Sequence, residues 1–377
     1  MRDFIHLLNL DVPKLQRRLH SLLKPEGLQS RLPLPQEALY PPITGSPARK
    51  RWFWLLTRIL RHVRKPLPAG FANPVRRKTT HRPIPLSPVY GSVLDYTKTP
   101  LLNTRPGTVH VHTRNTQRLH RLCREAKVSI GAGCFALVAL VMMEMHELRH
   151  PDIPLSERSP FISGFPLNPR AFFNHHTEPN SLMLAFSDGI ALPFLPSHLD
   201  LDGRIRLLAR QAHRQLAAYQ KRARLTDDDD AIQYMSSRGA GRVLANQYLS
   251  SIERSDLLLP PHLRQGINPQ GAYPMRPNHS MQTNGVSSVG RAGSVIQQGM
   301  YDITDGGKDF AADFRSITSN VRARDGEFLV GIGGSDVGLW VNASIDASAM
   351  DPQLVEQWRT RLEHILDSPD EDVKARL

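Results

Sequence analysis

Apolar residues are spaced in ways that predict several helices from residue 115 onward. Helices are predicted over Asn115–Ala126 and over Ser129–Met145, the latter apolar on nearly every side and therefore typical of a buried helix. A long basic helix follows over Arg204–Arg222. The pair Asp351-Pro352, an N-cap with a first-turn proline, predicts a last helix over Gln353–Leu366.

The first part of the chain has a different pattern. Residues 4–24 predict an amphipathic helix interrupted by Pro13, and residues 25–47 predict a loop. Residues 48–65 predict a second amphipathic helix, with apolar side chains such as Trp52 on one face and cations crowding the other. Proline-rich residues 66–88 then predict a linker, and the body of the protein is expected to begin near Pro88.

Strands are predicted by short runs of apolar and β-branched residues. One lies before the first body helix and another ends at Arg170, whereas the rest follow residue 280. Strands that alternate with helices and then run together favour an α/β sandwich over a doubly wound sheet. The strand before the first body helix is predicted over Val109–His112. The strands after residue 280 are predicted over Asn284–Val289, Phe310–Ser316, Phe328–Ile332 and Leu339–Ile345.

Charge is distributed unevenly along the chain. The formal net charge is +13, and residues 1–82 carry all of this excess, because the remainder holds 31 basic and 31 acidic residues. Two cysteines in 377 residues are expected to be reduced, buried thiols. No signal peptide is recognisable, and the apolar run at Ser129 is expected to be too short to cross a bilayer, so a cytoplasmic protein is expected.

Several motifs offer candidate chemistry. His198 and Asp202-Gly203 have the spacing His-x-x-x-Asp-Gly, which would make His198 a general base, although Asp202 would equally serve as the N-cap of the following helix. His175-His176 is a histidine pair without a third ligand at a spacing that suits a metal. Ser287 and Ser288 could each offer a hydroxyl to a tetrahedral oxyanion, or simply belong to a polar strand.

The segment Gly164-Phe-Pro-Leu-Asn-Pro-Arg170, the strand around Asn284-Gly285 and the surrounding order of elements resemble the coenzyme-A-dependent acyltransferase superfamily. The resemblance is to its fungal O-acetyltransferase branch and covers roughly residues 85–367. It implies an α/β fold, a chloramphenicol-acetyltransferase-like two-layer sandwich. Residues 88–377 would form the C-terminal lobe, and residues 1–87 would be the remnant of an incomplete N-terminal lobe.

The resemblance also implies roles for individual residues. Arg170 would form a structural ion pair with the aspartate of a His-His-x-x-x-Asp-Gly motif, which is expected to fall ahead of Met1. Residues Asn284, Gly285, Ser287 and Ser288 would line the tunnel in which two substrates meet. His198 and Asp202 are the candidates for catalysis within the chain.

The function implied is acyl transfer from acyl-CoA, such as acetyl-CoA, to the hydroxyl of a hydrophobic alcohol, for example a terpenoid. No bound cofactor, metal or nucleic acid is expected. The alternative is a catalytically inactive, condensation-like protein that acts as a binding module. Residues 48–65 have the composition of an interfacial helix, so peripheral membrane contact is a further expectation.

Overall fold

The computed structural model describes most of the predicted body and two N-terminal helices. The described residues are 2–27, 32, 45–49, 51, 52, 55, 67–78, 103–168, 185–187, 189–220, 260–264, 282–291, 293, 297, 299–304, 306, 307, 310–314, 319–323, 326–335 and 338–367. Arg170, His175 and His176 lie outside these residues, as does most of the predicted helix over 48–65.

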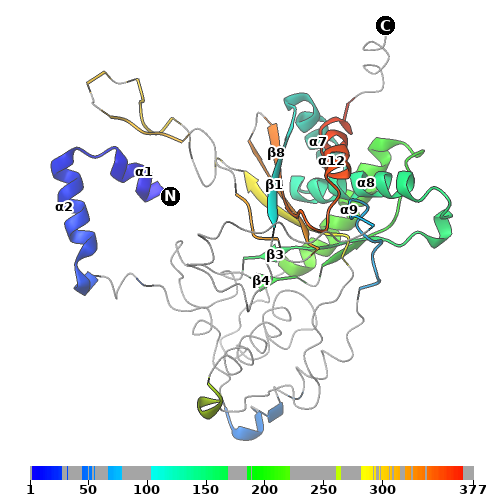
Figure 1. Ribbon diagram of the computed structural model, residues 1–377, viewed down its shortest axis with the longest axis horizontal. Coiled ribbons are helices and arrows are strands. Elements are labelled where there is room, and N and C mark those ends of the chain that lie inside the picture. The colour runs from blue at the N-terminus through cyan, green and yellow to red at the C-terminus, as the bar shows by residue number, and fades with distance from the viewer. Residues whose placement is uncertain are drawn as a thin grey trace.

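A mixed sheet in the order β1-β8-β7-β6-β2-β5 forms the centre of the body (Figure 1). Strands β2, β6 and β7 run parallel to one another, and the other neighbours pair antiparallel. A second, short ladder joins β3 to β4. The bounds are β1 Thr104–Val111, β2 Phe161–Gly164, β3 Pro166–Leu167, β4 Ala185–Phe186, β5 Ile190–Leu192, β6 Asn284–Arg291, β7 Phe328–Ser335 and β8 Gly338–Asp346.

Four helices pack together against one face of this sheet (Figure 1). They are α7 Thr113–Glu125, α8 Ile130–Arg149, α9 Leu201–Gln220 and α12 Pro352–His364. Short 3₁₀ turns occupy Leu155–Glu157 and Pro261–Leu263. The predicted α/β class and two-layer arrangement are therefore confirmed.

Helix α8 lies at the middle of the helical layer. It has 20 residues, more than predicted, and is long and apolar enough by composition to cross a membrane. However, 78% of its most apolar stretch is buried within the protein, which is the behaviour of a core helix. Ser129 caps its start, accepting a hydrogen bond from the backbone N–H of Ala132. Cys123 lies on α7 and Cys134 on α8, and both are free, buried thiols, as expected.

The two faces of the sheet differ in composition. On β8, the side chains that face the helices are apolar, whereas Asn342, Ser344 and Asp346 point to the opposite face and are nevertheless buried. Strand register places Phe328 on the helical face, where its ring packs edge-on against Trp358 of α12 with 5.0 Å between ring centroids. The apolar core is thus formed between the sheet and its helical layer.

Three predictions about local structure are wrong in detail. Pro13 does not interrupt a helix: α1 (Arg2–Leu8) ends first, and α2 (Val12–Leu23) accommodates the proline in its first turn, where no N–H is needed. Residues 310–314 form no strand. Helix α9 begins at Leu201 and not at Arg204, because the Asp200 side chain accepts a hydrogen bond from the N–H of Gly203.

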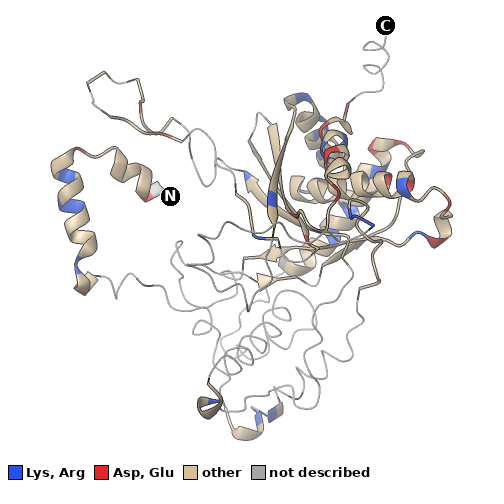
Figure 2. Cartoon of the chain, in the orientation of Figure 1, with Lys and Arg blue, Asp and Glu red and all other residues tan. Residues whose placement is uncertain are grey.

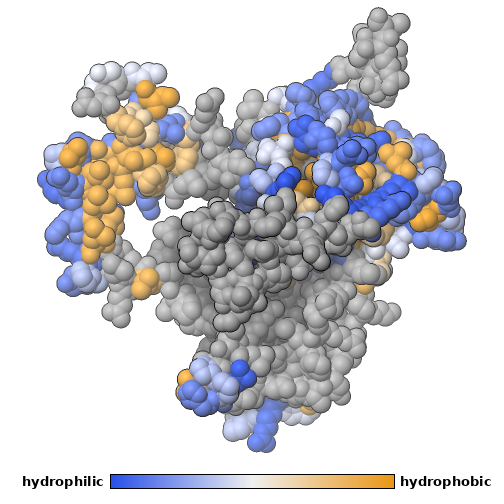
Figure 3. All heavy atoms as spheres, in the orientation of Figure 1, coloured by the Kyte–Doolittle hydropathy of each residue, from blue (hydrophilic) through white to orange (hydrophobic). Residues whose placement is uncertain are grey.

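Helices α1 and α2 stand apart from the helical layer (Figure 1). No residue of α2 is buried, and its apolar side chains gather on one surface while Lys and Arg residues lie elsewhere along it (Figures 2 and 3). Asn9 joins this segment to residues 299–314, since its side chain hydrogen-bonds both the carbonyl and the N–H of Ala312. Residues 67–78 of the same predicted region behave differently, because Phe71 and Val75 are buried in the core of the body. The described part of the expected linker over residues 66–88 is therefore packed against the body, which begins before Pro88.

Candidate functional site

The candidate site lies where β6 separates from β2. The described pairing between these strands consists of two residue pairs, Ser163 with Asn284 and Gly164 with Gly285. Strand β6 continues to Arg291 with β7 on its other side. Val286 is still buried, whereas Ser288–Arg291 are exposed, so the end of β6 beyond its pairing with β2 is accessible from solvent. This exposed end is called the opening at β6.

Asn284 begins β6 and pairs with Ser163, on the buried side of this opening. It is buried, and neither its amide nitrogen nor its amide oxygen has a hydrogen-bond partner among the described residues. A buried amide without partners costs free energy, on the order of 1–3 kcal/mol for each unsatisfied group. An unsatisfied buried amide of this kind is explained by local strain or by a ligand that supplies the missing hydrogen-bond partner.

Ser287 and Ser288 do not face the same way. Successive side chains of a strand alternate between faces, and the register pairs Ser287 with Gly331 and Ser288 with Ile332. Ser288 therefore shares the helical face with Asn284, whereas Ser287 points to the opposite face with Gly285. One oxyanion would be reached by one of these hydroxyls and not by both.

Ser288 lies at the beginning of α8. A Cβ atom placed on Gly131 would be 3.2 Å from the Ser288 hydroxyl oxygen, so glycine is what allows this close approach. The first turn of a helix presents N–H groups and the positive end of the helix dipole. The hydroxyl of Ser288 and the start of α8 are thus placed together in a manner that favours negative charge.

Gln282, which was not among the predicted site residues, lies just before β6 and contacts Gly164 of β2. Its side-chain oxygen accepts a hydrogen bond from the N–H of Gly164 at 3.2 Å. A Cβ atom on Gly164 would be only 2.6 Å from that oxygen, so a larger residue would displace the amide. Gly164 is the only sign of this contact in the sequence, because a glycine permits a close approach. Its partner, Gln282, is 118 residues away and cannot be identified from the sequence.

His198 and Asp202 lie elsewhere. Asp202 forms an ion pair with Arg118 at 2.7 Å, and Arg118 also donates to the carbonyl oxygen of Leu366, so Asp202 links α9 to α7 and the end of α12. It is not the N-cap, a role that Asp200 fills. His198 is exposed in the turn before α9.

The position of His198 separates it from β6. Its neighbour Ser197 donates its N–H to the carboxylate of Glu147, near the last turn of α8, whereas Ser288 lies beside Gly131 in the first turn. The 16 residues between Gly131 and Glu147 span about 24 Å of helix. The structure therefore does not bring His198 together with the predicted tunnel residues.

The fold and site define an α/β sandwich with a polar opening beside a parallel strand pair. No known family model matches the sequence, and no curated protein matches it. Among solved structures, the chain is similar to a trichothecene 15-O-acetyltransferase from Fusarium sporotrichioides, with 10% identity, a TM-score of 0.47, and coverage of 86% of this chain and 52% of that one.

Two further solved structures are similar to a comparable degree. One is a cyclization-docking bidomain from Sorangium cellulosum, with 11% identity, a TM-score of 0.37, and coverage of 86% of this chain and 50% of that one. The other is the X-domain from teicoplanin biosynthesis, with 12% identity, a TM-score of 0.41, and coverage of 95% and 59%. The chain spans little more than half the length of these structures.

Proposed function

We propose that this chain is part of an acyl-CoA-dependent O-acyltransferase that transfers an acetyl or similar group to the hydroxyl of a hydrophobic alcohol such as a terpenoid. The observation that carries the proposal is the opening beside β6, where the unpartnered amide of Asn284 and the hydroxyl of Ser288 share one face at the start of α8. The motif resemblance of Gly164–Arg170 supports the same reaction class.

In the proposed reaction the alcohol oxygen attacks the thioester carbonyl, and the carbonyl oxygen becomes an oxyanion. The C–S bond then breaks, and coenzyme A leaves as the thiol with the proton that the alcohol lost. Ser288 would donate a hydrogen bond to the oxyanion, and the dipole of α8 would favour its charge. Asn284 would orient the donor or the acceptor. We assign the general base to neither His198 nor Asp202, because both lie at the other end of α8.

Labelled acetyl-CoA offered with a panel of terpenoid alcohols tests this assignment. Ser288→Ala is expected to lower kcat by about 100-fold, the usual cost of removing one oxyanion donor. Ser197→Ala is the matched control, because it removes the same hydroxyl at the far end of α8, and it should leave transfer unchanged. His198→Ala should also leave it unchanged, and a loss of activity there would contradict the placement of the site.

The alternative is an inactive, condensation-like binding module, favoured by the separation of His198 from Ser288. It predicts that the folded chain binds acyl-CoA or an alcohol without transferring the acyl group. Binding that Asn284→Ala weakens, with no turnover in any panel member, would support this alternative. Peripheral membrane contact through residues 48–65 stays a separate proposal, which vesicle sedimentation with and without that segment would test.

A further inference from the structure

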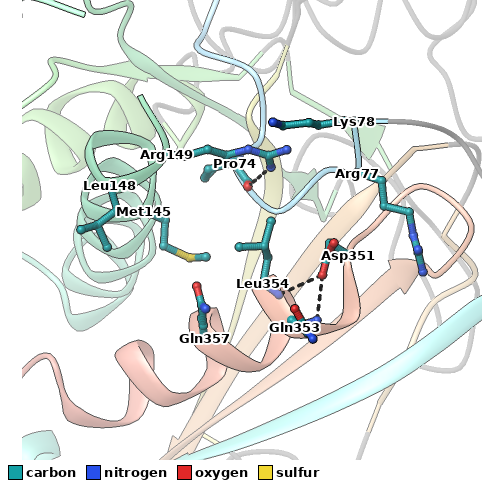
Figure 4. A pocket seen from close by; sticks show the side chains of 10 residues that line it. All are labelled: Pro74, Arg77, Lys78, Met145, Leu148, Arg149, Asp351, Gln353, Leu354 and Gln357. Carbon is teal, nitrogen blue, oxygen red and sulfur yellow. Dashed lines mark hydrogen bonds between the residues drawn. The ribbon is translucent and has the colours of Figure 1, made fainter. Parts of the chain in front are cut away.

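A second concave site lies at the opposite end of α8 from the opening at β6. It is a cavity of about 490 Å³ between the last turns of α8, the first turn of α12 and residues 74–78 (Figure 4). This volume falls within the range of small-molecule sites. From Gly131 to Arg149 the helix spans 18 residues, or about 27 Å, so the two sites are separate.

The backbone around residues 74–78 is held firmly in place. Arg76 forms a β-bridge with Met350, and Arg77 donates its backbone N–H to Ala349 and its Nε to the Met350 carbonyl, at 2.9 and 2.7 Å. Arg149, from the end of α8, donates its guanidinium to the carbonyl oxygens of Pro74 and Arg76. The wall of the cavity is therefore built by contacts between segments that are distant in the sequence.

Three cations line this cavity: Arg77, Lys78 and Arg149. Within the described residues, Arg77 hydrogen-bonds through its backbone N–H and its Nε, and its terminal nitrogens have no partner there. Lys78 is exposed at the rim. The single carboxylate in the lining, Asp351, already accepts hydrogen bonds from the N–H groups of Gln353 and Leu354 as the cap of α12 (Figure 4). The lining thus carries a formal charge of +2.

The other side of the cavity is apolar. Met145 of α8 points toward Leu354 of α12 (Figure 4), and Leu148 of α8 also belongs to the lining. Leu148 is 64% exposed, so its side chain is accessible to a ligand. A small, fully hydrated anion would use the cations and leave this wall in contact with water.

We propose that this cavity binds a phosphate monoester that carries a short apolar chain. A phosphate monoester has a charge of about −1.5 to −2 at neutral pH, which complements the charge of the lining, whereas a carboxylate supplies one unit. Guanidinium groups suit phosphate oxygens because they donate in a planar fork, and a lysine adds a mobile point charge. The apolar wall would cover the chain of the ester.

Isothermal titration of the full chain with hexyl phosphate tests the proposal. Lys78→Glu is the main variant, because Lys78 makes no described intramolecular contact and its replacement leaves the wall intact. It should weaken binding by at least about tenfold, since it replaces an attractive charge with a repulsive one. The matched control is Arg210→Glu, an equal charge reversal at an exposed position of α9, which should leave affinity unchanged. Equal weakening by both variants would show non-specific attraction and overturn the proposal.

Two further titrations test the apolar wall. Inorganic phosphate and hexanoate should each bind at least several-fold more weakly than hexyl phosphate, because each lacks one half of the proposed ligand. Leu148→Gln should weaken hexyl phosphate while leaving inorganic phosphate unchanged. Equal affinity for phosphate with and without its chain, or no heat with hexyl phosphate while circular dichroism shows a folded chain, would overturn the proposal. Loss of acyl transfer in Ser288→Ala is independent of all these outcomes.

Discussion

The two faces of the central sheet handle buried polar groups differently. On the face away from the helices, Asp346 accepts hydrogen bonds from Gly326 and Ser348, and the Asn342 oxygen accepts one from Thr108. On the helical side, the amide of Asn284 and the indole N–H of Trp358 are buried without partners among the described residues. The first face is stabilised by hydrogen bonds and the second by apolar packing, which tolerates an unpaired group where packing or a ligand compensates.

The largest expected effect is on the helical side, at Trp358. This side chain is 1% exposed and packs on Phe328, so Trp358→Ala should lower the free energy of unfolding by about 3–5 kcal/mol. Trp340, half-buried on the opposite face, is the matched control, and its replacement by alanine should cost clearly less. Urea denaturation of both variants measures the difference. Equal losses would contradict the assignment of the main core to the helical side.

The next effect is the pH dependence that His146 contributes. Burial lowers the pKa of His146 to about 4, helped by the positive charges of His150 and Arg158, and Arg158 is placed 2.9 Å from its Nδ1. Above pH 6.5 the imidazole is neutral in both states and the full stability is present. Between pH 6.5 and 4 the unfolded chain binds a proton that the folded chain does not, so up to roughly 2–3 kcal/mol is lost as pH falls.

His146→Gln should flatten this part of the stability profile, because an amide oxygen accepts the Arg158 hydrogen bond without titrating. His110→Gln, on an exposed part of β1, is the control and should leave the slope as it is. Chemical denaturation at several pH values between 4 and 7 measures both. Parallel profiles for His146→Gln and the unmodified chain would rule out His146 as the source of the slope.

A smaller effect is expected on the polar face at Asp346. Its carboxylate accepts from the N–H of Gly326 at 2.7 Å and from both the N–H and the hydroxyl of Ser348. Asp346→Ala should therefore destabilise by about 1–3 kcal/mol, since the part-buried N–H of Gly326 loses its partner. Ser348→Ala, which removes only one of the donors, should cost less. A negligible change in the thermal midpoint of Asp346→Ala would mean that this face does not depend on its hydrogen bonds.

The smallest effect is the coupling between Thr108 and Asn342, which join β1 to β8 at 3.1 Å. A double-mutant cycle with Thr108→Val and Asn342→Ala should give a coupling of about 0.5–1.5 kcal/mol, the net value of one such bond. The cycle uses free energies of unfolding for the two single variants and the double variant. If the effects of the two substitutions are strictly additive, this hydrogen bond makes no net contribution to the stability of the polar face.

Local signals explain which elements were predictable. Asp351-Pro352 and Ser129 fix the starts of α12 and α8 through contacts within three residues, so these helices were found within a few positions. Phe310 begins an apolar run that looks like a strand, yet pairing is non-local and residues 310–314 find no ladder. The described boundaries of the other elements differ from the predicted ones by a few residues, because the ends of helices and strands fray.

The site was predicted only in part. The segment Asn284–Ser288 was selected from its residues, but the separation of Ser287 from Ser288 follows from strand register, and the approach of Ser288 to α8 depends on Gly131. The cationic cavity was not foreseen because Arg77 and Arg149 are far apart in the chain. The hydrogen bonds from Arg149 to the carbonyl oxygens of Pro74 and Arg76 show that their segments meet.

The length of α8 has a consequence for kinetics. Because its two ends are about 27 Å apart, one small molecule cannot touch both the opening at β6 and the cavity beside Arg149. A phosphate ester in the cavity would leave the acyl donor free to bind, so the ester should not compete with that donor in steady-state kinetics. The length of α8 thereby allows the two proposed sites, one at each of its ends, to be occupied at the same time.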